Sequence, residues 1–170
     1  VHDYLITDAA HAAALQGAAG APPTDEQLLL AEDEDGMGVS LYVDRAVLER
    51  LMARCPLRTL GDDNLADYCT ALEGVSHFHY LVWSAVRARR VSLLELELQG
   101  EVDKYASALR LMLSQRAGRF PADLYQRLFE QATFLPTLSA AERQRYEEAH
   151  RCAARFCRRL EERFLRCRQA

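Results

Sequence analysis

Lysine and long apolar runs are what this sequence most conspicuously lacks. Lys104 is the only lysine among 21 basic residues, and the others are all arginine. No apolar stretch reaches the roughly 20 residues that a membrane-spanning helix needs. The first 20 residues have no basic start and carry Asp3 and Asp8, so we expect no signal peptide. We therefore expect a cytoplasmic protein with no membrane association.

Paired cysteines are also missing, and the cysteine spacing does not suit a metal site. The five cysteines form an odd set without a C-x-x-C pair, and three of them lie on one predicted helix. We expect reduced thiols in a cytosolic protein. Glycine-rich nucleotide loops, H-E-x-x-H and G-x-S-x-G are also missing from the sequence. The sequence therefore favours a non-enzymatic protein without a cofactor.

The composition and the helical periodicity together indicate the fold class. The chain has 170 residues, of which 49% are hydrophobic and 27% charged, as in an ordinary globular protein. We predict a single, mainly helical domain. Residues 62–170 form a helical bundle built on a central antiparallel hairpin of helices 63–90 and 92–115. Residues 1–56 form an N-terminal segment that contains a small β-hairpin.

The N-terminal segment is predicted from its turn residues and its alternation. Residues 4–16 are rich in alanine and favour a helix, although Tyr4–Thr7 alone also fits a short strand. Gln27–Glu32 and Val39–Asp44 flank an acidic turn that contains Asp-Gly, which is typical of a hairpin with a four-to-six-residue loop. Within the second strand, Val39, Leu41 and Val43 share one face.

Helix boundaries are marked by capping residues. Asp44 predicts the start of a helix over 45–54, and Asp62 or Asp63 predicts the start of the long helix to about Arg90. Two Ser-x-x-Glu capping boxes open the helix over 92–115 and a final helix that runs nearly to the C-terminus; their residues are Ser92 with Glu95 and Ser139 with Glu142. Pro121 predicts a further helix to about Thr133.

A polar cluster on the central helices is the first candidate site. Glu97, Glu101 and the unique Lys104 lie on one helix that also carries an apolar stripe, and the predicted hairpin places Tyr80 opposite Glu101. Charged groups among apolar ones are typical of an interaction site. We therefore interpret the chain as an interaction or regulatory protein of bacterial type with a protein partner, which includes a second copy of itself in a homodimer.

A metal centre is the alternative interpretation. Helical bundles hold iron, manganese or zinc between carboxylates and histidines that are one turn apart. Here Glu147-x-x-His150 has that spacing and Glu73-x-x-x-His77 is one residue longer, with Glu101 as a further ligand. The competing interpretation is that Glu73 and His77 form a surface pair. His79 falls inside the apolar stripe of its helix and is then expected to be a core histidine.

The final helix offers a second alternative, nucleic-acid binding. Its predicted apolar seam includes Tyr146, Ala149, Ala153 and Phe156. A basic face lies opposite this seam and could follow a phosphate backbone. The basic residues of this face are Arg151, Arg155, Arg158, Arg159 and Arg166. The net charge of −4 and the lack of a recognition motif argue against this alternative.

Overall fold

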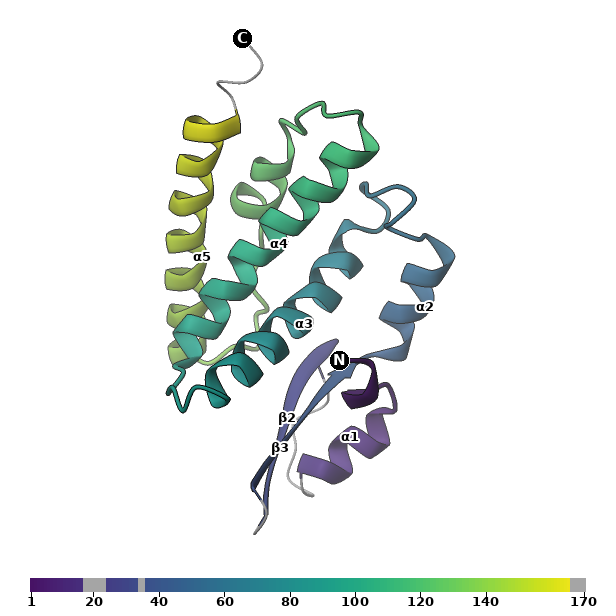
Figure 1. Ribbon diagram of the computed structural model, residues 1–170, viewed down its shortest axis with the longest axis vertical. Coiled ribbons are helices and arrows are strands. Elements are labelled where there is room, and N and C mark those ends of the chain that lie inside the picture. The colour runs from purple at the N-terminus through teal and green to yellow at the C-terminus, as the bar shows by residue number, and fades with distance from the viewer. Residues whose placement is uncertain (17–23, 34–35, 166–170) are drawn as a thin grey trace. The chain divides into compact units, whose positions relative to one another are not determined.

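The computed structural model describes residues 1–16, 24–33 and 36–165 (Figure 1). The described chain is mainly helical with a small three-stranded sheet, which confirms the predicted fold class. It divides into two compact units, Val1–Arg90 and Val91–Ala170. The helix after residue 62 thus belongs with the N-terminal segment, whereas we expected a subdivision at 56–62. The prediction of a single domain stays a prediction.

The first unit contains the sheet, whose strand order is β1-β3-β2. Strands β2 (Glu26–Asp33) and β3 (Gly36–Val43) form the predicted antiparallel hairpin, with Leu28 opposite Leu41. Each strand is longer than expected, and the connecting residues 34–35 lie outside the described residues. A short strand β1 (Leu5–Ile6) pairs in parallel with β3, so the strand alternative holds for residues 5–6 and helix α1 (Ala9–Gln16) follows.

Both faces of β3 are covered within the first unit. Leu41 and Val43 pack on one face against α2 (Arg45–Ala53) and α3 (Leu65–Ala85), where they meet Val47 and Phe78. Tyr42 points to the other face and packs beside α1. This alternation is the predicted one. The core of the unit is therefore a sheet with helices on both sides.

Gly74 allows α3 to lie close to the sheet. A Cβ atom at this position would come within 2.7 Å of Leu41 Cδ1 and of Glu26 Oε2. Such distances are shorter than any real Cβ contact. The glycine therefore sets how closely α3 approaches β2 and β3.

The termini of α2 and α3 follow the sequence only in part. Asp44 caps α2 as predicted, because its carboxylate accepts a hydrogen bond from the Ala46 amide at 2.7 Å. The prediction that Asp62 or Asp63 caps α3 was wrong: the N-cap is Asn64. The Asn64 side chain instead accepts from Gly61 N at 3.0 Å and donates to the carbonyls of Arg54 and Thr59. The Asn64 side chain therefore bonds to the preceding loop and not to the first amides of α3.

The second unit pairs two long helices, α4 (Leu93–Gln115) and α5 (Ala140–Leu160). Both predicted capping boxes are present, Ser92 with Glu95 and Ser139 with Glu142. A π-helical turn, η3 (Glu161–Leu165), continues α5. The helix expected from Pro121 to Thr133 is mostly replaced by a π-helical segment, η2 (Gln126–Glu130).

Helices α4 and α5 run in the same direction (Figure 1). The connecting segment, which contains η2, therefore leads back from the end of α4 to the start of α5. Small residues on α5 allow close packing against α4. The buried residues of this core are Tyr105, Ala108, Leu109 and Met112 on α4, Ala149, Ala153 and Cys157 on α5, and Leu124 and Phe129 between the helices.

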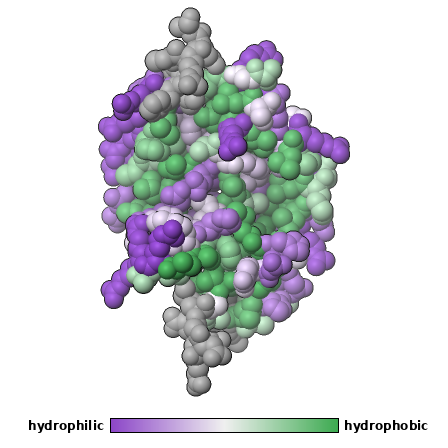
Figure 2. Space-filling model, viewed as in Figure 1, coloured by the Kyte–Doolittle hydropathy of each residue, from purple (hydrophilic) through white to green (hydrophobic). Residues whose placement is uncertain are grey.

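Some large apolar side chains remain on the surface, where green areas are interspersed with polar ones in Figure 2. Met52, Leu57 and Val86 are 74%, 75% and 79% exposed. Within the described residues, no helix is both long and apolar enough to cross a membrane.

Candidate functional site

The predicted interaction residues belong to different units. Tyr80 lies on α3 in the first unit, whereas Glu97, Glu101 and Lys104 lie on α4 in the second. Within the second unit the three α4 side chains contribute to a network with α5. The surroundings of these side chains decide what their charges can do.

Three polar pairs connect α4 to α5 and to its continuation η3, and we call them the polar ladder. Glu97 forms an ion pair with Arg145 at 3.5 Å, and Glu101 contacts His150 at 3.0 Å. The third pair is a hydrogen bond of 2.6 Å from the Tyr105 hydroxyl to Glu161 Oε1. The α4 members are four residues apart and therefore share one face. The partners of these residues, Arg145, His150 and Glu161, follow one another in the same order along α5 and η3. The ladder therefore fits two helices that run in parallel.

His150 is held on both ring nitrogens. Nδ1 lies 3.0 Å from Glu101 Oε2, and Nε2 lies 3.0 Å from the Phe129 carbonyl oxygen. A carboxylate and a carbonyl only accept hydrogen bonds, so both nitrogens donate when both bonds form, and the ring is an imidazolium. The hydrogen bond to Glu101 is the main cause that raises the pKa of His150, and burial opposes it. His150 therefore joins α4, α5 and η2 as a cation.

Glu101 is the matching anion at the centre of the ladder. Burial by itself disfavours its charged form, but hydrogen bonds from His150 and Lys104 outweigh this and lower the pKa of Glu101. The Lys104 ammonium donates to Glu101 Oε1 at 2.7 Å. The only lysine of the chain thus has an internal partner one turn along the same helix.

The inner end of the ladder is almost inaccessible to solvent. Tyr105 and Glu161 are both 1% exposed. Cys157 lies fully buried on the same side of α5, and burial raises the pKa of its thiol to about 12. A thiol with such a pKa stays protonated near neutral pH, so it is a poor nucleophile. The ladder therefore acts as a structural element of the helix pair.

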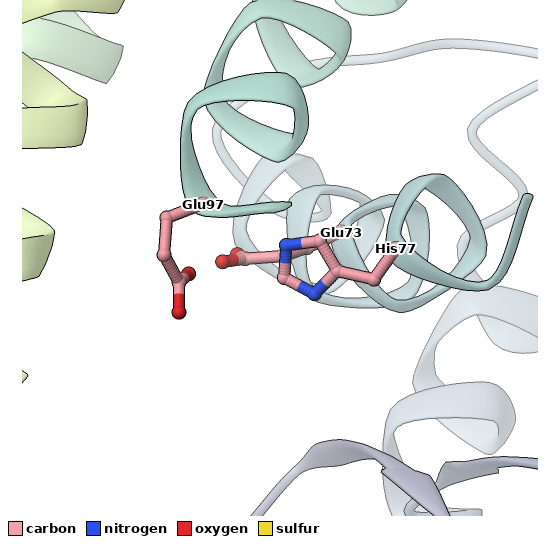
Figure 3. A group of neighbouring side chains, drawn as sticks. All are labelled: Glu73, His77 and Glu97. Atoms are coloured by element: carbon pink, nitrogen blue, oxygen red, sulfur yellow. The ribbon is translucent and has the colours of Figure 1, made fainter. Parts of the chain in front are cut away.

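The residues of the metal alternative are only partly brought together. Glu73 and His77 project from the same side of α3, and their ligand atoms lie within 4.8 Å of each other (Figure 3). Glu97, also drawn there, belongs to α4 and to the second unit. Two ligands from α3 are fewer than the three or four that a structural or catalytic zinc site uses.

Within the second unit, Glu101 and His150 meet but Glu147 does not join them. Glu147 is exposed, although it lies one turn before His150 on α5. A metal ligand must offer a lone pair, and both nitrogens of His150 donate hydrogen bonds in the arrangement seen. Metal binding there would require both of these bonds to break. The metal alternative stays a prediction.

Two side chains lie on the opposite side from that expected. His79 is exposed and not in the core, whereas the neighbouring Phe78 packs against the sheet. On α5, we expected Phe156 to be buried, but it is 50% exposed, and the neighbouring Cys157 is buried in its place. The reason is the same in both helices. The face that is buried is the one that packs against a neighbouring element, and the face one residue further along the helix is almost equally apolar in sequence.

The predicted basic face of α5 is exposed, except that Arg166 lies outside the described residues. Arg151, Arg155 and Arg159 follow each other at four-residue intervals along this face. Arg158 has internal partners: it donates to Glu130 at 3.0 Å and lies over the ring of Tyr125. Part of this face is therefore used to fasten the η2 segment.

A hollow in the first unit has no counterpart among the predicted sites. It measures about 1060 Å³ and lies between α2 and the loop before α3. Its apolar side is formed by α2, and its rim carries charges of both signs. The lining includes Leu48, Leu51, Met52, Arg54, Cys55, Arg58, Thr59, Gly61, Asp62, Asp63 and Asn64. We call it the α2 hollow.

The walls of the α2 hollow are held by tertiary bonds. Asn64 donates to the carbonyls of Arg54 and Thr59 at 2.8 and 2.9 Å. Arg50 on α2 forms a bidentate pair with Asp67 on α3, with its shortest distance at 2.7 Å. Sequence reasoning overlooked the hollow because these contacts join positions up to 17 residues apart. The apolar residue Met52 on the short predicted helix over 45–54 was the one feature of the sequence that pointed to this region.

No protein-family model, curated protein or solved structure matches this chain. Its function is therefore inferred from the geometry alone.

Proposed function

We propose that this protein acts by binding a partner protein, and that the α2 hollow receives an apolar segment of that partner. The observation that supports the proposal most directly is the combination of a large hollow with exposed apolar side chains at its edge. Met52 lines the hollow and is 74% exposed, and Leu57 in the adjoining loop is 75% exposed. Exposed apolar side chains beside a hollow are typical of an interaction site.

The rigidity of the walls favours binding. The bonds of Asn64 and the Arg50–Asp67 pair hold the loop and α2 before any partner arrives. A preformed site loses less conformational entropy on association than a flexible one. Covering both Met52 and Leu57 would then contribute a few kcal/mol, since a fully buried apolar side chain contributes roughly 1.5–3 kcal/mol.

The rim indicates how a partner segment would be oriented. Arg54, Arg58, Asp62 and Asp63 are exposed along the lining and give it charges of both signs. An amphipathic helix or extended segment with apolar anchors and charges of both signs would match this pattern. Rim charges of this kind determine orientation and association rate more than affinity.

The test compares Met52→Glu with Leu30→Glu in the full chain. Leu30 is 54% exposed on β2, so its change introduces the same charge on the same unit away from the hollow. Tagged proteins are expressed in the native cells, cross-linked, purified and analysed by mass spectrometry. We expect a protein that is retained by the wild type and by Leu30→Glu, and reduced at least about tenfold by Met52→Glu. An identical set of bound proteins in all three samples would reject the hollow as the binding site.

One observation keeps nucleic-acid binding as a second candidate. Phe156 is 50% exposed between Arg155 and Arg159, and single strands are bound by aromatic side chains that stack on bases beside basic ones. Binding to oligo-dT should then weaken steeply with salt and with Phe156→Ala. A lack of retention at low salt would reject this candidate.

A further inference from the structure

An exposed group of aromatic and arginine side chains lies at the C-terminal end of α3. Trp83, the only tryptophan of the chain, is 45% exposed and stacks on Tyr80 with 6.0 Å between ring centroids. The Arg87 guanidinium lies 4.3 Å from the centroid of the Trp83 ring. Arg89 lies 5.8 Å from the centroid of Tyr80 and 6.0 Å from that of Trp83. We call these four residues the aromatic–arginine cluster.

The backbone places both arginines on the same pair of rings. Helix α3 ends in a Schellman motif, in which Arg89 N donates to Ser84 O and Ala88 N donates to Ala85 O. Ala88 is the left-handed residue of this motif, with a φ of 49°. This conformation costs an L-residue about 1–2 kcal/mol, and glycine is the usual residue here. Strain of this kind is often found where a structure arranges side chains for recognition.

The stacked arginine is prepared to bind an oxyanion. The Arg87 guanidinium lies over the Trp83 ring, and a guanidinium can bind a carboxylate with two parallel hydrogen bonds. Arg87 is additionally held by a hydrogen bond of 3.2 Å from its Nη1 to the Trp83 carbonyl. Its orientation is thus determined before an anion arrives.

Apolar surface adjoins the cationic one. Val86 is 79% exposed and Val82 is 37% exposed beside the cluster. Tryptophan, tyrosine and arginine are the residue types enriched among those that dominate binding energy in protein interfaces. A complementary surface would therefore combine carboxylates with aliphatic side chains.

We propose that the aromatic–arginine cluster binds a short acidic segment of a partner protein, one that carries aliphatic residues between its carboxylates. The net negative charge of the first unit favours a short peptide segment over a nucleic acid. Residues 1–90 hold fourteen acidic residues and only seven arginines. A nucleic acid carries a phosphate at every nucleotide and would be repelled beyond the cluster, whereas a short acidic segment meets the arginines locally.

This surface goes beyond the proposed function, because it is separate from the α2 hollow. The hollow adjoins the first turn of α3 and the cluster occupies its last, and a helix of 21 residues is roughly 30 Å long. A partner could engage either surface without the other. The two proposals can therefore fail independently.

Binding at the cluster can be measured by tryptophan fluorescence, because Trp83 is the only tryptophan of the chain. The full chain is titrated with a synthetic peptide of alternating glutamate and leucine, with the same peptide carrying glutamine for glutamate, and with oligo-dT of equal length. The variants are Arg87→Gln and, as a control, Arg45→Gln, which removes the same charge from an exposed position on α2. Met52→Glu tests independence from the hollow.

We expect the acidic peptide to change Trp83 emission, with an affinity that falls with salt. Arg87→Gln should weaken this binding about tenfold, while Arg45→Gln and Met52→Glu leave it within about twofold. Equal binding of the glutamine peptide, or equal affinities of Arg87→Gln and Arg45→Gln, would overturn the proposal. Tighter binding of oligo-dT would overturn it in favour of a nucleic acid, and the absence of any response at about 1 mM peptide would also reject it.

Discussion

Two cations that lie beside aromatic rings, one in each unit, differ in exposure: His150 in the second unit is enclosed, whereas Arg87 in the first unit is exposed. His150 lies between Phe129 and Phe134 and donates to Glu101. Arg87 lies on Trp83 at the surface, where its in-plane donors can reach a partner. Similar chemistry thus has two roles. Enclosed charges determine which elements pack together, and exposed ones are available for recognition.

The largest effect is expected when the enclosed set loses its central anion. Glu101→Ala leaves His150 and Lys104 without their shared carboxylate, and we expect the free energy of unfolding to fall by about 2–3 kcal/mol. Urea denaturation measures the change. Glu147→Ala removes an exposed acid from α5 and should change stability by less than about 0.5 kcal/mol. Equal effects of the two substitutions would show that the ladder is not a structural element.

The first unit depends on the close approach of α3 to the sheet, and Gly74→Ala tests this. The added Cβ would collide with Leu41 and Glu26, so we expect a loss of about 1–2 kcal/mol despite the better helix propensity of alanine. Gly61→Ala is the control, because a Cβ there meets nothing within 4 Å. Equal changes in melting temperature for the two variants would contradict this account of α3 packing.

The enclosed cation makes the stability of the second unit depend on pH. The pKa of His150 is raised in the folded chain, so its contribution is complete below its unfolded pKa of about 6.5 and is lost as the pH rises through the folded value. The pKa of Glu101 is lowered, so its contribution is present above about pH 4.5 and is lost as the pH falls through its folded value.

Melting curves across this range check the sign. His150→Gln should remove the loss of stability on the alkaline side, whereas His79→Gln, at an exposed position of the first unit, should keep the wild-type profile. NMR of the His150 ring reports its protonation directly. A ring that is neutral at pH 6 would contradict the imidazolium assignment.

The smallest effect is expected at the helix ends. Ala88 and Ala117 have φ values of 49° and 50°, one in each unit. Replacement of either by glycine relieves the left-handed strain but adds unfolded-state entropy, so we expect a gain of about 0.5–1 kcal/mol. Ala88→Gly should leave acidic-peptide binding within about twofold, because glycine adopts the same left-handed conformation and keeps the backbone bonds that place Arg87 and Arg89. Ala117→Gly is the control for this readout.

Local features of the fold were predictable, and nonlocal ones were not. The caps at Asp44, Ser92 and Ser139 involve residues within three positions of each other, and the hairpin follows from alternation beside a turn. The Asn64 cap was not predicted, because its side chain bonds to carbonyls up to ten residues away. In the candidate sites, Glu101 and His150 were grouped in the metal alternative and do meet, whereas the ion pair of Glu97 with Arg145 was not predicted.

The sequence by itself determined which segments are helical and where most of them begin, because caps, breakers and periodicity act over one or two turns. Only the tertiary structure decided which helix face is buried and what each charge contacts. Exposed Phe156 and buried Cys157 are neighbours on α5, and the choice between them depends on the close approach of α4. Glu101 reaches His150 only because residues 116–139 return the chain to make α4 and α5 parallel. Contacts across such distances depend on the path of the whole chain, and no local pattern records that path.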